Sequence, residues 1–162
     1  MEEETNMSPA TASQHELREQ LGARPLMLFD GQCGLCHNAV QWVIRRDADD
    51  LFRFAPQDST VAAEILQRHG IDRDAMLKSN SVYMVLDAGT VRERLLTQSD
   101  VTVNILTQLG GRWRFLGYLL RVVPSFLRNA AYGIFARNRY RLAARYNVCP
   151  VPAKANQKKF IS

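Results

Sequence analysis

The chain has 162 residues, enough for one domain with a hydrophobic core of its own. With 46% hydrophobic and 23% charged residues it has the composition of a folded protein, and 3 cysteines are too few for a disulfide-stapled secreted scaffold. The net charge of +5 conceals two unlike parts: residues 1–100 carry 10 Lys and Arg against 16 Asp and Glu (−6), whereas residues 101–162 carry 11 Lys and Arg and no acidic residue (+11).

The first 24 residues are predicted to be a flexible N-terminal segment. Within it, Ser13-Gln-His-Glu16 has the spacing of a capping box and Gly22 could end the short, optional helix that the box begins. They include three consecutive acids and have neither the basic and apolar regions of a secretory signal nor the composition of a transit peptide. The longest apolar stretch, from Phe115 to Leu127, is interrupted by Arg121 and Pro124 and is shorter than a membrane-spanning helix. We therefore expect a cytoplasmic protein whose thiols are reduced.

From residue 25 onward the hydrophobic pattern alternates between strands and helices. The second predicted helix has Asp58 as its N-cap and ends at Gly70. The predicted elements are a strand at 25–30, a helix at 33–46, a strand at 51–55, a helix at 59–69, two strands at 81–87 and 90–96 joined by a turn, and a helix from 99 to 109.

This order, β-α-β-α-β-β-α, predicts an α/β fold. The crossover through a helix makes the first two strands parallel, and the hairpin makes the last two antiparallel. The result is a mixed four-stranded sheet with helices on both faces, which is the thioredoxin-like arrangement.

Two further helices are predicted after this core, at about 112–123 and 125–146. Their apolar residues, Phe126 among them, are expected to pack this helical extension against the core. We predict a single domain from 25 to 150 and a loose tail from 151 to 162.

The strongest chemical signal is Cys33-Gly34-Leu35-Cys36, which lies directly after the first strand and at the start of the first helix. Only a thiolate attacks sulfur, and a helix N-terminus offers unpaired N–H groups and a partial positive charge that stabilise one. We therefore predict that the pKa of Cys33 is lowered, into the range of about 3.5–7.5 found in such motifs. Cys36, one turn further along and at the start of the apolar stripe, is predicted to be the less exposed thiol.

These positions predict a thiol–disulfide oxidoreductase. Cys33 attacks a substrate disulfide, and Cys36 then attacks Cys33 and releases the reduced substrate. Gly34 is expected to let a partner chain approach closely, and Leu35 to offer it an apolar contact. Asp30 either forms the turn after the strand or exchanges a proton with Cys36.

Other interpretations of the cysteines stay open at this point. The pair could be two buried apolar residues without a redox role. With His37 it completes C-x-x-C-H, the attachment pattern for c-type haem, and with Cys149 or a histidine it could hold zinc. Because an export signal is missing and further ligands are scarce, no metal or other cofactor is predicted. Cys149 is either a buried structural thiol or a third redox partner.

The stretch Asp30-Gly-Gln-Cys33-Gly-Leu-Cys36 resembles the signature of the DCC family of thiol–disulfide oxidoreductases, which is named for that aspartate and the two cysteines. Later segments also resemble the family's landmarks: Ser99-Asp100 before a helix, Leu109-Gly110-Gly111, Pro124, and residues 136–141 followed by Cys149-Pro150. The resemblance covers roughly residues 26–152. It implies a thioredoxin-like fold and a redox-active pair at Cys33 and Cys36.

The resemblance also bears on the substrate. Thioredoxin-like enzymes place a cis-proline before the third strand, where it helps to hold the substrate chain, and no proline stands near residues 79–81 here. Ser99-Asp100 is similar to the helix start that holds the glutathione carboxylate in glutaredoxins, so it is a candidate anion site as well as a candidate N-cap. The implied partners are a disulfide-containing protein or a small thiol such as glutathione.

The basic C-terminal helices indicate an alternative to a thiol–disulfide oxidoreductase. Four arginines between residues 137 and 145 stand close to Tyr140 and Tyr146, a pattern found at nucleic-acid sites and on membrane-surface helices. The family resemblance covers this segment and favours a structural role, so a nucleic acid is not expected as a partner and peripheral membrane contact stays open. The alternative to an enzyme is therefore a non-catalytic module that binds an anionic partner.

Overall fold

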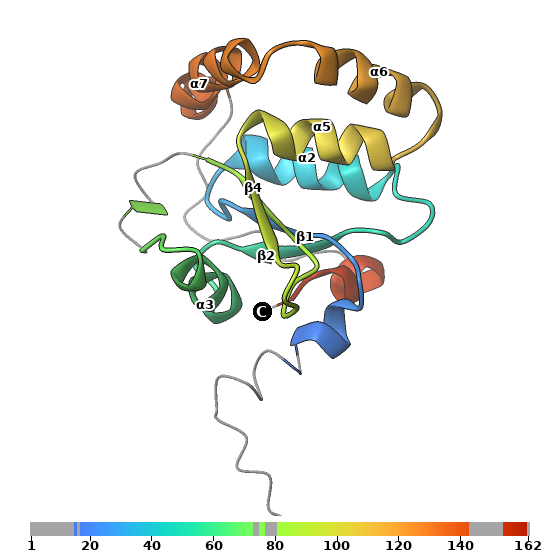
Figure 1. Ribbon diagram of the computed structural model, residues 1–162, viewed down its shortest axis with the longest axis vertical. Coiled ribbons are helices and arrows are strands. Elements are labelled where there is room, and N and C mark those ends of the chain that lie inside the picture. Colours follow the sequence, from blue (N-terminus) through green and yellow to red (C-terminus); the bar gives the residue numbers. More distant parts are fainter. Residues whose placement is uncertain (1–14, 16, 73–74, 77–80, 143–153, 162) are drawn as a thin grey trace, which may run out of the picture.

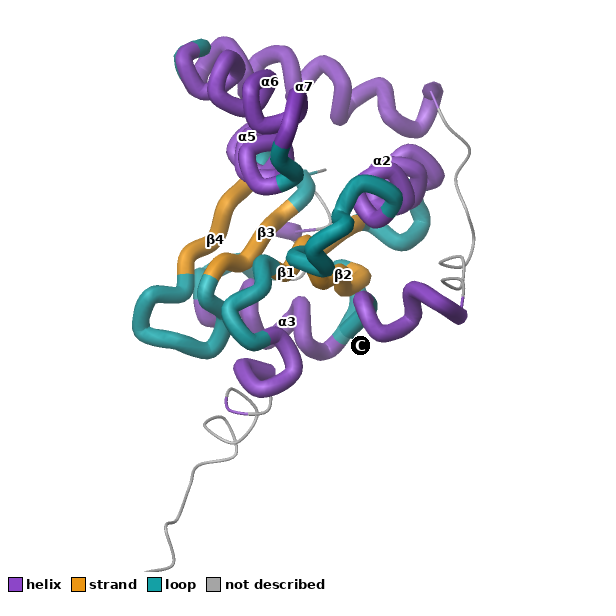
Figure 2. Tube along the Cα trace, turned by 90° about the vertical axis from the view of Figure 1, so that its right-hand side faces the viewer, coloured by secondary structure: helices purple, strands orange, loops and turns teal. Residues whose placement is uncertain are grey.

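The described residues form one mixed sheet of four short strands. The computed structural model describes residues 15, 17–72, 75–76, 81–142 and 154–161. The strands are β1 (Leu26–Phe29), β2 (Arg53–Pro56), β3 (Tyr83–Leu86) and β4 (Arg94–Thr97). They lie in the order β2-β1-β3-β4, with β1 parallel to β2 and antiparallel to β3, and with β4 antiparallel to β3 (Figure 1 and Figure 2). The predicted thioredoxin-like arrangement is thereby confirmed.

Helices cover both faces of this sheet. They are α2 (Gly34–Ile44), α3 (Thr60–Arg68), α5 (Ser99–Gln108), α6 (Gly111–Val122) and α7 (Ser125–Leu142), followed by the short 3-10 helix η1 (Lys154–Lys159). Helices α2 and α5 lie on one face of the sheet and α3 on the other, and α6 and α7 form an outer layer beyond α2 and α5 (Figure 1).

Strand β1 contributes to two cores, because successive side chains of a strand point to opposite faces of the sheet. Leu26 and Leu28 are buried in the core that contains the apolar residues of α3. Met27 and Phe29 are buried in the core that contains those of α2 and α5. This burial on both faces is why the segment is an unbroken apolar run.

The start of α3 differs from the prediction by one residue. Ser59, not Asp58, is the N-cap, and its hydroxyl accepts a hydrogen bond from the Ala62 N–H at 3.2 Å. The same hydroxyl donates to the carbonyl of Pro56 at 2.7 Å, so it ties the end of β2 to the helix. Asp58 is one residue too early for this i to i+3 geometry.

Both ends of the described chain are packed, which corrects two predictions. Residues 17–21 are helical and the helix ends at Gly22, as expected for the optional short helix. Leu17 and Leu21 are buried in the core on the α3 face, however, so the flexibility predicted for residues 1–24 is wrong for these residues. The tail predicted to be loose from 151 to 162 is fixed over residues 154–161. There the Ile161 N–H donates to the Phe54 carbonyl at 2.8 Å, and the Phe160 ring packs on the Phe54 ring.

An ion-pair network also fixes this C-terminal segment. Lys159 Nζ lies 2.7 Å from a carboxylate oxygen of Asp47 and 2.7 Å from one of Asp50. The Asp47 side chain is completely buried and accepts two further hydrogen bonds, from backbone N–H groups of the loop that leads into β2. Hydrogen bonds from Arg53 and Lys159 hold the pKa of Asp50 well below its usual range. The loop after α2 and the C-terminal segment therefore hold each other in place.

The outer helices dock through small, aromatic and polar residues rather than through most of their large apolar ones. Gly117 of α6 lies against Thr107 of α5, and Trp113 packs edge-to-face on Trp42 of α2 with ring centroids 4.8 Å apart. Four apolar residues of α7 that were predicted to pack against the core are exposed instead: Phe126, Leu127, Ile134 and Phe135. That prediction is wrong because helical spacing identifies an apolar face without saying whether another element covers it.

Replacing Gly117 by alanine is expected to destabilise the docking of α6 on α5. A Cβ there would lie 2.7 Å from Thr107 Cγ2 and 2.8 Å from the Thr107 backbone nitrogen, so the two helices would have to separate. We expect the free energy of unfolding, measured by urea denaturation, to fall by about 1–3 kcal/mol. The control is Gly133→Ala in α7, where the nearest atom is the flexible end of Arg137 at 3.5 Å and helix propensity favours alanine. An equal loss in both variants would show that the close approach is not responsible.

Candidate active site

The two cysteines stand at the start of α2, directly after β1. Asp30 follows the strand, and its Oδ1 accepts a hydrogen bond from the Gln32 N–H at 2.9 Å. The carbonyl of Asp30 accepts a second bond, from the Cys33 N–H at 3.2 Å. These bonds form a tight turn that places Cys33 at the N-cap of α2. Of the two predicted roles of Asp30, turn formation is observed, and proton exchange with Cys36 stays a prediction.

Cys33 has the capping position that a serine or an aspartate occupies in many helices. Its backbone is extended, with φ −90° and ψ 110°, and its Sγ accepts a hydrogen bond from the Cys36 N–H at 3.4 Å. A thiolate accepts such a bond more strongly than a thiol does, and the positive end of the helix dipole favours the same ionised form. The site therefore offers Cys33 the backbone environment that activates cysteines.

The exposure of the two thiols is the reverse of the prediction. Cys33 is only 1% exposed, whereas Cys36 is half-buried. The spacing of Cys36 from Val40 and Val43 correctly places it on the same side of α2 as these two buried residues. Towards the N-terminal end of α2, however, the neighbouring helices do not close on that side, and a cavity remains at Cys36.

This cavity has a volume of about 430 Å³ and is almost entirely apolar. Its walls come from α2, α5 and α7, from β1 and from the residue just before β3. The residues that line it are Met27, Leu35, Cys36, Asn38, Ala39, Trp42, Val43, Val82, Val101, Thr102, Ile105, Leu106, Tyr132 and Phe135. Leu35, which was predicted to contact a substrate, lines the cavity. Gly34, which was predicted to let a partner chain approach, is buried and does not line it. Sequence reasoning missed the residues from α5 and α7, because the fold alone brings them beside α2.

Tyr132 connects α7 to the sheet beside this cavity. Its hydroxyl accepts a hydrogen bond from the Val82 N–H at 3.0 Å, and the Val82 carbonyl accepts one from the Gln98 N–H at 3.3 Å. The main chain of Val82, just before β3, is therefore already hydrogen-bonded within the chain. Residues 79–80, near which thioredoxin-like enzymes would have their cis-proline, lie outside the described residues. The described part of the chain has no cis peptide bond. No pattern in the sequence pointed to Tyr132.

Ser99 and Asp100 lie at the start of α5, but their side chains bind α7. The Ser99 hydroxyl donates a hydrogen bond to the side-chain oxygen of Asn129, and Asp100 forms an ion pair with Arg128 at 3.0 Å. The N-cap of α5 is Gln98, whose side chain makes no capping bond. The predicted N-cap role is therefore wrong, and the predicted anion site at this helix start stays a prediction.

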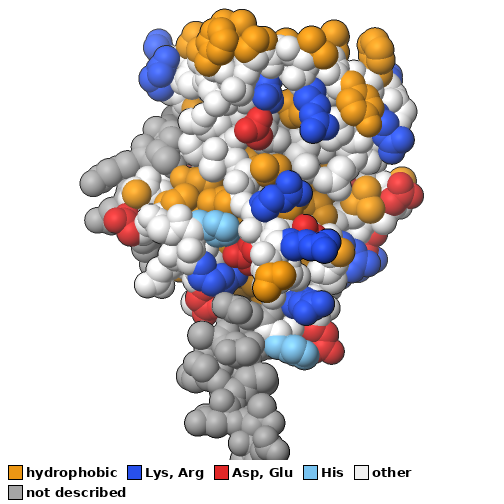
Figure 3. Space-filling view, viewed as in Figure 1, with side chains coloured by type: hydrophobic (Ala, Val, Ile, Leu, Met, Phe, Trp, Pro, Cys, Tyr) orange, Lys and Arg blue, Asp and Glu red, His pale blue; other side chains and the backbone are white. Residues whose placement is uncertain are grey.

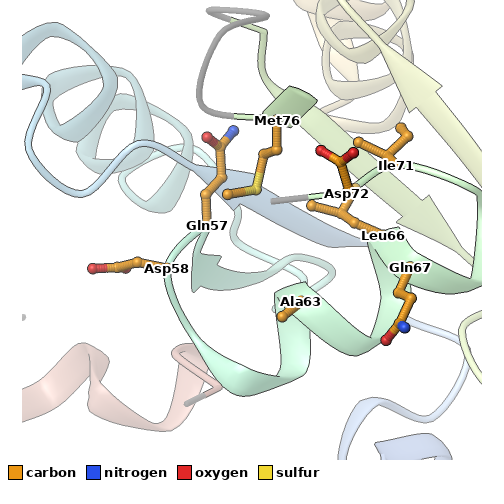
Figure 4. Close-up of a pocket in the computed structure, with 8 residues that line it drawn as sticks. All are labelled: Gln57, Asp58, Ala63, Leu66, Gln67, Ile71, Asp72 and Met76. Carbon is orange, nitrogen blue, oxygen red and sulfur yellow. The ribbon is translucent and has the colours of Figure 1, made fainter. Parts of the chain in front are cut away.

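A second cavity lies on the α3 side of the sheet and holds no cysteine (Figure 4). It has a volume of about 240 Å³, and its lining residues are Gln57, Asp58, Ala63, Leu66, Gln67, Ile71, Asp72 and Met76. The side chain of Gln57 is buried and donates hydrogen bonds to the carbonyls of Leu28 and Ser81. Gln57 therefore bonds to the main chain of β1 and of the segment before β3, and this cavity is separate from the thiols.

The residues considered as metal ligands do not gather in the described part of the chain. No three side chains of His, Cys, Asp or Glu converge there. The backbone N–H of His37 donates to the Cys33 carbonyl at 3.0 Å, as the first turn of α2 requires. Cys149 lies outside the described residues.

A mixed four-stranded sheet with helices on both faces, carrying a C-x-x-C pair at the start of its first crossover helix, defines a thioredoxin-like protein. The family model of the DCC1-like thiol-disulfide oxidoreductases matches residues 27–145, and the chain belongs to that family.

Two relatives support this assignment. The chain is 32% identical to the uncharacterized protein YuxK of Bacillus subtilis over 143 residues, which are 88% of this chain and 97% of that protein. It is 30% identical to a chloroplastic DCC family protein of Arabidopsis thaliana over 126 residues, which are 78% of this chain and 69% of that protein. No solved structure matches the chain.

Proposed function

We propose that this protein exchanges disulfides through Cys33 and Cys36. The Cys33 thiolate attacks one sulfur of a substrate disulfide, the bond between the substrate sulfurs breaks, and one half leaves as a thiolate that takes up a proton. Cys36 gives its proton to Asp30 and attacks Cys33 Sγ, and the bond between Cys33 and the substrate sulfur breaks. The second half leaves as a thiolate, takes the proton back from Asp30 to become a thiol, and leaves a Cys33–Cys36 disulfide. The substrate gains two electrons and two protons, and the protein loses them.

The hydrogen bond from the Cys36 N–H to Cys33 Sγ at the start of α2 carries this proposal. It favours the ionised form of Cys33, and the thiolate is the form that attacks sulfur. Because Cys33 is almost completely buried, a substrate reaches it only after the packing above it opens. Cys36 needs no such opening, since it borders the apolar cavity. The order of attack is therefore the step that the experiment must decide.

The cavity indicates which substrates suit the site. Its apolar walls favour an uncharged, apolar group next to the disulfide over the charged groups of glutathione. The main chain of Val82 is bonded to Tyr132 and Gln98, so it offers less to an extended peptide than an unbonded strand would. We therefore propose a small apolar disulfide, or an apolar side chain beside a protein disulfide, as the substrate group.

The test uses 2,2′-dithiodipyridine, an uncharged aromatic disulfide that releases a coloured thione. All proteins carry Cys149→Ser, so that only the pair reacts. We expect the otherwise unchanged protein to form the Cys33–Cys36 disulfide, and Cys36→Ser to stop at a mixed disulfide on Cys33 that mass spectrometry identifies. Capture on Cys36 in Cys33→Ser, with none in Cys36→Ser, would overturn the proposed order. Reaction of both variants no faster than free cysteine would overturn the proposed function.

A further inference from the structure

Helices α6 and α7 carry a concentration of exposed apolar side chains. Among the described residues, 10 large apolar side chains are exposed, and all except Val91 belong to these two helices. Hydrophobic side chains gather over α6 and α7, with Lys and Arg side chains close to them (Figure 3). Scattered exposed apolar residues are ordinary, but a contiguous group on one face marks an interaction surface.

The apolar residues of α6 form a stripe directed away from the protein. Phe115, Leu119 and Val122 follow one another at spacings of four and three residues and are 72%, 56% and 82% exposed. Phe126, at the start of α7, is 69% exposed and follows them across the turn between the helices. We call these four residues the outer stripe. Gly117, by contrast, faces Thr107 and attaches α6 to α5.

The charge around the outer stripe has one sign. No acidic residue follows Asp100 in the chain, and Asp100 itself is paired with Arg128. Arg112, Arg114 and Arg121 lie on α6 with three of the four residues of the stripe, and all three arginines are exposed. An apolar stripe on a helix that carries exposed arginines and no acidic residue is the pattern of a helix that lies in the interface of an anionic membrane.

We propose that the outer stripe docks this protein on the surface of an anionic lipid bilayer. A second copy of the chain suits the surface less, because a symmetric dimer would place arginines against arginines. A nucleic acid would use the arginines but would leave Leu119 and Val122 in water. No described helix is both long and apolar enough to span a bilayer, so the contact is one of a helix lying on the surface.

This inference does not depend on the thiol chemistry, although α7 contributes a residue to each surface: Phe126 to the outer stripe and Phe135 to the cavity. Phe135 of α7 lines the cavity beside Cys36 and is itself about half exposed.

The test is co-flotation of the full chain with phosphatidylcholine vesicles that contain or lack phosphatidylserine. We expect binding to the anionic vesicles that weakens as salt is added, and much weaker binding to the neutral ones. The variant Phe115→Ser with Val122→Ser should lose about tenfold or more in affinity, because both side chains would otherwise enter the bilayer. Arg121→Gln should lose several-fold and show a shallower salt dependence.

The matched control is Val91→Ser, which removes a fully exposed apolar side chain far from these helices and should bind as the unchanged protein does. All the substituted side chains are exposed, so circular dichroism should show folded variants. If the variant Phe115→Ser with Val122→Ser bound anionic vesicles as tightly as the unchanged protein does, the proposal would be overturned. So would absence of binding to anionic vesicles at low salt, or a concentration-dependent dimer that the same variant abolishes.

Discussion

Replacing Cys33 by serine is expected to slow the reaction of the protein with 2,2′-dithiodipyridine by about a hundredfold or more. The reason is that Cys33 alone has its sulfur at the N-terminus of α2, where the Cys36 N–H points at it. Cys36→Ser should retain the fast first step and lose only the second release of thione. Stopped-flow absorbance measures both phases, again with Cys149→Ser in every protein.

The control for this prediction is Arg45→Gln, an exposed position at the C-terminal end of α2 that does not line the cavity, which should leave both phases unchanged. Thiolate absorbance near 240 nm, followed against pH in Cys36→Ser, gives a second and independent measurement. A Cys33 pKa as high as the ordinary value of about 8.5 would contradict the proposed activation. Because absorbance does not require access of a reagent, it separates ionisation of Cys33 from its burial.

Replacing Asp47 by alanine is expected to lower the free energy of unfolding by about 3–5 kcal/mol. The substitution leaves Lys159 buried with its charge only partly paired, and it leaves two backbone N–H groups without their acceptor. Lys159→Met should be less harmful, because the Asp47 carboxylate that it leaves without a cation keeps its two backbone hydrogen bonds. Urea denaturation, followed by circular dichroism, measures all three proteins.

The control is Asp49→Ala, which removes an exposed carboxylate from the same loop and should change the unfolding free energy little.

The free energy of unfolding measured against pH gives a second test of the network. The folded state holds the pKa of Asp50 below the unfolded value, so the unfolded chain binds more protons and stability falls as the pH drops below about 4. Equal stability of Asp47→Ala and Asp49→Ala would show that the C-terminal segment does not depend on this network.

Local sequence determined much of the fold and the place of the site. The strands β1 and β3 are apolar runs, and helices α2 and α3 have apolar faces at helical spacing, so the order of elements followed from near neighbours along the chain. The position of Cys33 at a helix N-terminus followed in the same way. Asp30 supplies the turn, and the next residues begin the helix.

The tertiary structure decided which faces are covered. It reversed the expected exposure of Cys33 and Cys36, because the helices around the start of α2 leave a cavity at Cys36. It joined Lys159 to Asp47 across 112 residues of chain and thereby fixed a segment whose polar composition predicted a loose tail. It also left the apolar residues of α6 and α7 outside. Spacing along a helix defines a face, but only residues distant in the sequence decide whether that face meets protein, water or another partner.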